Sequence, residues 1–325
     1  MLNPARRWAR EGASRLAAFQ HADLRGLSAC MVALSNPVTG DATRARGLLD
    51  VVHRRLRDDG RRPVPLALAA RAVRAARWLG QDRPEPGAHP DGLAAARARI
   101  RRALDGPLAL SLPPMATAAT AAPAEDKAPA HEARLTPASL AEVLQACRED
   151  ARSDEQRDRA DQFCRRWFAL ARQTLTSRPG LDLAAAHVPL WLTAGQQLGD
   201  AAMVDLALIL AEWVGRHQRL SDPGAADWGG IARTAQTPGG TSAGHAVALV
   251  VGLRATRLNG DREAERRLRR MALAALDFVD GWWRSTEQGA SGAGATASEL
   301  AGLLTLAGVT ADASTAELLE LEVVS

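Results

Sequence analysis

The stretch GHAVALVVGLRATRLNGDREAERRLRRMALAALDFVDGWW occupies residues 244–283 and decides the fold. Its first part, residues 244–253, is small and apolar nearly all round, which predicts a buried helix. In its second part the apolar residues recur every three or four positions, at Ala264, Leu268, Met271, Ala275, Phe278 and Trp282. That spacing predicts an amphipathic helix with one face in water. Gly260-Asp261 separates the two parts, so the stretch reads as one helical hairpin.

The Gly-Asp joint recurs along the chain. Glycine suits the left-handed conformation just past a helix end. An aspartate carboxylate accepts hydrogen bonds from the free N–H groups that begin the next helix. Joints of this kind stand at Gly40-Asp41 and Gly199-Asp200, with looser versions at Gln81-Asp82, Ser153-Asp154 and Ala311-Asp312. The spacing indicates about six hairpins of roughly fifty residues each.

The composition favours an all-α chain. Ala, Leu and Arg, which are good helix formers, are abundant, and β-branched or aromatic runs of strand length are missing. We predict helices over residues 5–19, 23–34, 42–57, 65–79, 91–104, 137–149, 155–175, 182–197, 201–217, 242–258, 262–283, 296–307 and 313–322. Residues 111–135 are rich in Pro, Ala and Thr without helical periodicity, which predicts a disordered linker or insertion.

The hairpins contain two kinds of helix. The helix before a joint is apolar nearly all round, as in HVPLWLTAGQQL from His187, and the helix after it is amphipathic and rich in arginine. An inner ring of buried helices wrapped by an outer ring is an α/α toroid. We therefore expect the hairpins of residues 1–110 and those of residues 136–325 to belong to one toroid, closed or incomplete.

Part of this pattern resembles a known superfamily. Asp227-Trp228-Gly229-Gly230, a Gly/Thr-rich loop, Thr241-Ser242-Ala243-Gly244-His245 at the start of a buried helix, and Leu258-Asn259-Gly260-Asp261 look like hairpins of six-hairpin α/α-toroid proteins, most clearly over residues 180–310. That group includes glycan hydrolases, lyases, sugar epimerases and terpenoid-cyclase-like folds. The Asp-x-Asp-Asp motif of squalene cyclases, the zinc ligands of lanthionine cyclases and the paired-His motifs of sugar 2-epimerases have no counterpart, so those activities are not carried over.

In a toroid, polar residues about one turn into the inner helices line the mouth of the central cavity. His187, His245 and Glu299 stand at that depth, and Glu142 occupies a similar place. Imidazoles and carboxylates around one cavity suit acid–base work on a sugar. The alternatives are structural: Glu299 completes a capping box with Thr296, and the histidines are satisfied, partly buried side chains.

The loop that begins with Asp227 and Trp228 is the most suggestive candidate. An indole at a cavity mouth stacks on a sugar ring, and a neighbouring Asp binds its hydroxyls or acts as an acid. The alternative is a Trp that packs between hairpins, with glycines for the turns.

Two further tryptophans stand at the end of the helix predicted over residues 262–283. The apolar stripe of that helix predicts that Trp282 is buried and that Trp283 is exposed as an interaction site. In the first helix, packing of Trp8 is favoured over an alternative, attachment to an anionic membrane.

The charge and the cysteines give no support for nucleic-acid binding, a zinc site or a disulfide framework. Residues 1–112 hold 20 Arg against 10 Asp plus Glu, but these arginines fall mostly on helix faces opposite the apolar stripe, which gives no convincing nucleic-acid signal. Cys30, Cys147 and Cys164 are too far apart for a zinc site or a disulfide framework, and we expect each to be a small core side chain. We expect no metal and no cofactor.

Targeting signals are not recognisable in the sequence. No apolar segment follows the arginines at the N-terminus as in a signal peptide, and no stretch approaches the ~20 apolar residues of a membrane span. We expect a cytoplasmic protein, or an exported one if the chain is part of a longer protein. Two functions remain open: action on, or binding of, a glycan at the toroid mouth, and a non-catalytic helical-repeat scaffold for protein–protein interaction.

Overall fold

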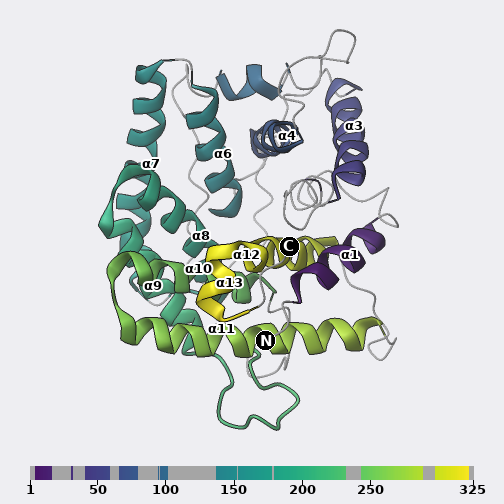
Figure 1. Ribbon diagram of the computed structural model, residues 1–325. Coiled ribbons are helices and arrows are strands. Elements are labelled where there is room, and N and C mark those ends of the chain that lie inside the picture. The colour runs from purple at the N-terminus through teal and green to yellow at the C-terminus, as the bar shows by residue number, and fades with distance from the viewer. Residues whose placement is uncertain are drawn as a thin grey trace, which may run out of the picture.

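The computed structural model describes residues 4–16, 31, 41–58, 66–79, 94, 96–101, 137–151, 153–177, 179–231, 243–287 and 297–321. Within these ranges the secondary structure is helical, apart from one isolated bridge between Gln218 and Ile231 (Figure 1). The all-α prediction is therefore confirmed for the described part of the chain. The predicted linker at residues 111–135 lies outside the described residues.

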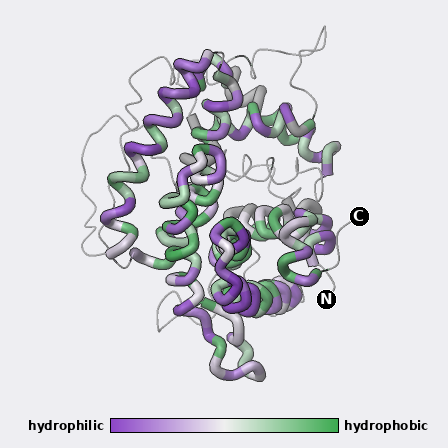
Figure 2. Tube along the Cα trace, turned by 60° about the vertical axis from the view of Figure 1, so that its left-hand side comes forward, coloured by the Kyte–Doolittle hydropathy of each residue, from purple (hydrophilic) through white to green (hydrophobic). Residues whose placement is uncertain are grey.

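The described helices follow the predicted ranges closely, and the predicted helices over residues 23–34 and 91–104 lie partly outside the described residues. The described helices are α1 (Ala5–Leu16), α3 (Ala42–Asp58), α4 (Leu66–Trp78), α6 (Pro137–Asp150), α7 (Asp154–Leu175), α8 (Leu181–Leu198), α9 (Ala201–Gly215), α10 (Ala243–Asn259), α11 (Arg262–Glu287), α12 (Ala297–Ala311) and α13 (Ala313–Leu319). The largest differences are at the C-terminal ends of α11 and α12, which run four residues past the prediction. Hydrophilic and hydrophobic residues alternate along many of these helices, as amphipathic packing requires (Figure 2).

The Gly-Asp joints have the predicted chemistry. Gly199 ends α8 with φ +62°, and the Asp200 carboxylate accepts a hydrogen bond from the backbone N–H of Ala202 at 3.1 Å. Gly260 has φ +67°, and Asp261 accepts from the backbone of the following turn at 2.9–3.0 Å. Because the glycine and the capping acid are adjacent, one helix ends and the next begins within two residues.

The even-numbered helices form a continuous series. α4 packs on α6, α6 on α8, α8 on α10 and α10 on α12, while α3, α7, α9, α11 and α13 each pack against members of that series. Small residues permit close approach: a Cβ on Gly252 of α10 would lie 2.2 Å from the Cβ of Ala211 in α9. A Cβ on Gly195 of α8 would lie 2.7 Å from Val204 in α9. Glycine at these points is therefore a packing requirement.

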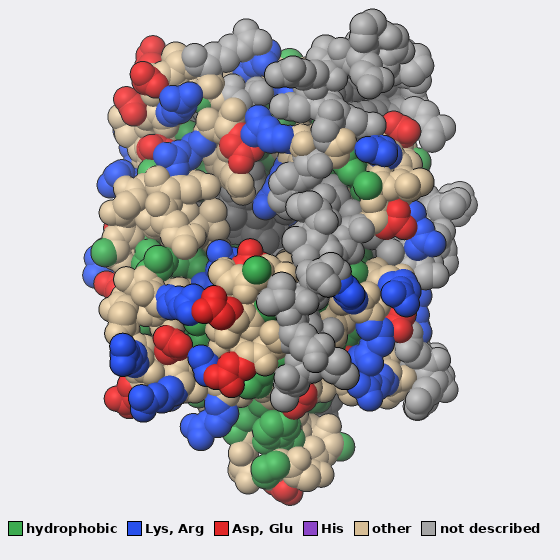
Figure 3. Space-filling view, in the orientation of Figure 1, with side chains coloured by type: hydrophobic (Ala, Val, Ile, Leu, Met, Phe, Trp, Pro, Cys, Tyr) green, Lys and Arg blue, Asp and Glu red, His purple; other side chains and the backbone are tan. Residues whose placement is uncertain are grey.

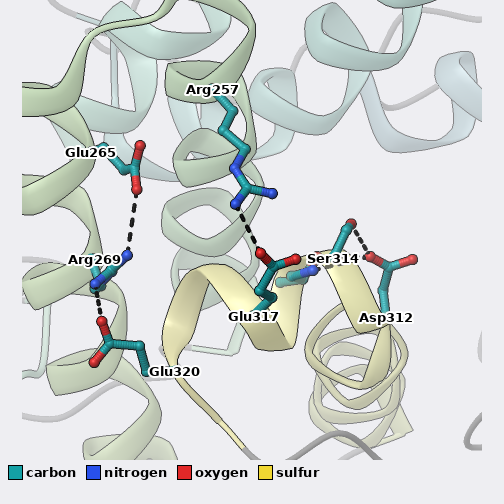
Figure 4. A network of polar contacts seen from close by, with 8 residues as sticks. Arg257, Glu265, Arg269, Asp312, Ser314, Glu317 and Glu320 are labelled. Carbon is teal, nitrogen blue, oxygen red and sulfur yellow. Dashed lines mark hydrogen bonds and ion pairs between the residues drawn. The ribbon is translucent and has the colours of Figure 1, made fainter.

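The C-terminal helix α13 is fixed to its neighbours by charged contacts (Figure 4). Arg257 of α10 forms an ion pair with Glu317 at 3.2 Å, and Arg269 of α11 forms one with Glu320. At its other end, Asp312 accepts a hydrogen bond from the backbone N–H of Thr315 at 3.1 Å, which caps the helix. These contacts hold a seven-residue helix that is too short to be stable alone.

The N-terminal helix α1 packs along α12 and corrects one prediction. Trp283, predicted to be exposed, is fully buried, whereas Trp282 is only partly buried. The Trp283 indole N–H donates to the Glu11 carboxylate of α1 at 2.7 Å. Trp8 is also fully buried, as predicted. The apolar stripe of α11 gave the wrong tryptophan because α1 covers the other side of the helix near its end.

Candidate functional site

His187 lies inside the helical packing. Its side chain is 0% exposed, and its Nδ1 is 2.8 Å from the backbone carbonyl oxygen of Leu183, so Nδ1 carries the proton of the neutral ring. The ring stacks on Trp191 with centroids 5.9 Å apart. Burial lowers the pKa of His187 below its ordinary value, and the hydrogen bond to Leu183 only partly offsets this. A neutral imidazole enclosed in this way is part of the core.

His245 lies beside the first turn of α8. It lies in α10 with 3% of its side chain exposed, and its Nε2 is 3.2 Å from Oδ1 of Asp182 at the start of α8. The Asp182 side chain is 60% exposed. Asp182 was not among the candidates predicted from the sequence, although an acid in the first turn of one apolar helix and a histidine in the first turn of the next apolar helix are a usable signal. The pair places a solvent-accessible carboxylate over a buried imidazole.

The predicted loop at Asp227 is held together by its own residues. The Asp227 carboxylate forms an ion pair with Arg219 on the opposite side of the loop. The backbone N–H of Arg219 donates to the Gly230 carbonyl at 2.9 Å, and that of Gly229 donates to the Arg219 carbonyl at 2.7 Å. Trp228 is partly buried. The guanidinium therefore neutralises the carboxylate that the sequence offered as an acid.

The same loop is anchored to α11. The buried Gln218 side chain donates from Nε2 to the carbonyl oxygens of Gly229 and Met271, each at 2.8 Å. Gly229 has φ +82°, and a Cβ there would lie 2.0 Å from the carbonyl oxygen of Ala274. Gly229, in the second half of Asp-Trp-Gly-Gly, thus allows the backbone of the loop to pack directly against the backbone of α11. In Figure 1 the segment after α9 projects beyond α11.

The two predicted glutamates are less fully described. Glu299 lies in the first turn of α12 and is partly buried. Thr296, its proposed capping partner, lies outside the described residues. Glu142 lies in α6, but its side chain is not among those described. Glu142 and Glu299 therefore lie on two helices of the even-numbered series, α6 and α12.

A small pocket that the sequence did not indicate lies between α6, α7 and α8. Its volume is about 10 Å³, room for about one water molecule. Apolar side chains and a polar rim line it: Leu144, Arg148, Ala160, Asp161, Cys164, Leu190, Thr193, Ala194, Gln197 and Leu198. Arg148 and Asp161 form an ion pair at 2.9 Å across the rim. Burial, with a smaller contribution from Asp161, raises the pKa of the Cys164 thiol to about 12. None of the predicted site residues lines this pocket.

The cysteines for which burial is described behave as predicted. Cys147 and Cys164 are both buried in the core, while Cys30 lies outside the described residues. Across the described chain, no three His, Cys, Asp or Glu side chains gather in a way that could hold a metal ion. The described helices also include none that is both long and apolar enough to cross a membrane.

Comparison with protein-family models, with curated proteins and with solved structures found no match to the chain.

Proposed function

We propose that this chain is a non-catalytic helical scaffold that binds a protein partner, built as an α/α toroid of about six hairpins. One observation carries the proposal: the imidazoles of His187 and His245 are 0% and 3% exposed. A general acid or base must come within about 2.6–3.2 Å of the proton that it transfers. Side chains enclosed by helix packing do not meet a substrate, so the groups best suited to acid–base chemistry serve the core.

The order of helix contacts supports the toroid. The even-numbered helices follow one another from α4 to α12, and the odd-numbered helices α7, α9 and α11 pack against them. α1 packs against α12, which brings the first described helix of the chain beside the last helix of the even-numbered series. This arrangement is what a ring of hairpins requires where its two ends meet. It also matches the resemblance to six-hairpin toroid proteins noted from residues 180–310.

The exposed apolar side chains of the described residues suggest where a partner binds. Leu170 of α7, Ile209 of α9 and Leu258 of α10 are 56%, 53% and 54% exposed. α9 contacts both α7 and α10, so the three side chains lie on neighbouring helices. On the face shown in Figure 3, charged side chains of both signs lie among small apolar patches. Apolar anchors within a polar surround are typical of protein interfaces.

Photo-crosslinking tests the scaffold. A photo-crosslinking amino acid replaces Ile209 in the full chain, and in a control chain it replaces Asp158, an exposed residue of α7. In an extract of the cells that express the protein, we expect one discrete protein adduct from position 209. The adduct should weaken on Leu170→Asp plus Leu258→Asp and be absent from position 158. Equal adducts at both positions would contradict a specific partner face.

A second candidate, glycan binding, is favoured by the contact between Asp182 and His245. The exposed Asp182 carboxylate stands where α8 begins, beside the start of α10, and can accept hydrogen bonds from sugar hydroxyls. An oligosaccharide array probed with the wild-type chain and with Asp182→Asn tests it. Binding that the substitution abolishes supports this candidate over the scaffold. Binding unchanged by the substitution, or no binding, removes it.

A further inference from the structure

The N-terminal helix is held by a reciprocal pair of hydrogen bonds. The Trp8 indole of α1 donates to the Asp280 carboxylate of α11 at 3.0 Å, and the Trp283 indole of α11 donates to the Glu11 carboxylate of α1 at 2.7 Å. Both indoles are 0% exposed. The residues of each pair are 272 positions apart in the chain. The first helix is therefore recognised by a specific binding site at the far end of the sequence.

We call this site the α1 seat and define it by Asp280, Trp283 and Leu304. Arg7 of α1 adds an ion pair to Asp280, and the Arg15 guanidinium lies 4.5 Å from the centroid of the Trp283 ring. These contacts are charge-assisted or involve a cation over an aromatic ring, and such contacts give orientation as well as affinity.

The shape of the seat fits one helix face. One stripe of buried residues runs along α1, because its members recur every three or four positions: Ala5, Trp8, Ala9 and Gly12. Where Gly12 passes α12, an added Cβ would lie 3.1 Å from Cδ2 of Leu304. Only a small residue fits at this crossing. The stripe and the seat match each other in size, charge and hydrogen-bonding groups.

We propose that the α1 seat also accepts α1 of a second copy of this chain, so that two copies dimerise by exchanging their first helices. Exchange preserves every contact described above, because all of them join α1 to the seat through side chains and packing. Residues 17–30 connect Leu16 to Met31, which is itself fully buried. A segment of that length spans at most about 50 Å, so α1 reaches a neighbouring copy while Met31 keeps its place.

The occupant follows from the chemistry of the seat. When α1 leaves, the Trp283 indole N–H loses its Glu11 acceptor. The Asp280 carboxylate loses Trp8 and Arg7 and keeps its ion pair with Arg284 of α11. The apolar side chain of Leu304 also loses the contact with Gly12. Another helix satisfies all three only if it carries an indole, a carboxylate and a small residue in the register of Trp8, Glu11 and Gly12. A second copy supplies that register by identity, and two seats with two helices form a closed, two-fold dimer.

Complementation between two full-length variants tests the exchange. The chain with Trp8→Ala has a defective α1 and an intact seat, and the chain with Trp283→Ala has an intact α1 and a defective seat. In a mixture, the intact helix of the second chain meets the intact seat of the first. Native mass spectrometry, with one chain tagged, measures species at twice the monomer mass of 34.5 kDa.

We expect the mixture to hold at least about ten times more heterodimer than either variant alone holds homodimer, since only the mixture can form the native helix–seat pair. A mixture that stays at the monomer mass overturns the proposal, and so do dimers of equal abundance in each variant alone. If either Ala variant fails to fold by circular dichroism, a milder pair repeats the test. That pair is Trp8→Phe with Glu11→Gln, against Trp283→Phe with Asp280→Asn, and each retains the buried rings.

Discussion

Replacing Gly229 with Ala tests whether the Asp-Trp-Gly-Gly loop is a structural anchor. The residue has φ +82°, and the new Cβ would lie 2.0 Å from the carbonyl oxygen of Ala274 in α11. A backbone carbonyl in the middle of a helix cannot turn aside as a flexible side chain can. The loop must therefore move away from α11, and the Gln218 hydrogen bonds to Gly229 and Met271 are lost with it.

The expected loss of stability adds these effects. A non-glycine residue in the left-handed region costs about 1–2 kcal/mol. Each Gln218 hydrogen bond contributes about 1 kcal/mol. We therefore expect Gly229→Ala to lower the free energy of unfolding by about 3–4 kcal/mol. Gly260 is a matched control, because its φ is +67° but nothing lies within 4 Å of an added Cβ. Gly260→Ala should cost only the backbone contribution, about 1–2 kcal/mol.

Urea unfolding followed by far-ultraviolet circular dichroism measures both variants, with the midpoints and slopes compared. Gln218→Ala should lose about 2 kcal/mol in the wild-type background and much less in the Gly229→Ala background, since the same hydrogen bonds are already broken. If Gly229→Ala is no more destabilising than Gly260→Ala, the loop does not rest on α11 as described, and Asp227 and Trp228 return as candidates for a mobile binding loop.

Three further predictions concern buried groups. Burial lowers the pKa of His187, so below about pH 6.5 the unfolded chain binds a proton that the folded chain does not. The free energy of unfolding should therefore fall by up to about 1.4 kcal/mol for each pH unit below 6.5, until the pKa of the folded state is reached. Urea titrations at pH 7.5, 6 and 5 should show a shallower fall for His187→Gln, and equal slopes would contradict this. The Cys164 thiol, with its pKa raised to about 12, should resist iodoacetamide at pH 8 in the folded chain and react in urea, as peptide mass spectrometry would reveal. Trp283→Phe should cost about 1.5–3 kcal/mol through loss of the hydrogen bond to Glu11, and a double-mutant cycle with Glu11→Gln that shows no coupling would refute that contact.

The sequence predicted the helices and their joints because those features depend on a few neighbouring residues. At Gly199-Asp200 and Gly260-Asp261, the left-handed glycine and the capping carboxylate complete their hydrogen bonds within three or four positions. No distant partner is needed, so the local pattern and the folded structure agree. The buried character of α8 and α10 was predictable for the same reason, since a helix that is apolar on all sides has no face for water.

The burial of Trp283 depends on residues far away in the sequence. The periodicity of α11 cannot show that Trp283 is covered, because the covering helix begins at residue 5. Asp227 was different: Arg219, its partner, stands only eight residues earlier, in the same loop. An arginine and an aspartate on either side of a turn followed by Gly-Gly indicate a closed loop, and this signal favours the structural interpretation over the catalytic one.

Small residues connect the packing of the helices to the proposed function. Gly252 meets Ala211, Gly195 meets Val204, and Gly215 meets Met271, and at each contact an added methyl group would overlap its neighbour. Helices that approach this closely leave little space between them at their crossings, and the pocket beside Cys164 has room for about one water molecule. The same glycines that permit this tight helix packing also leave no space between the helices at these crossings for a ligand. The side chains that a partner can reach therefore lie on the outer helices and in the turns between helices, and a binding function should be sought there first.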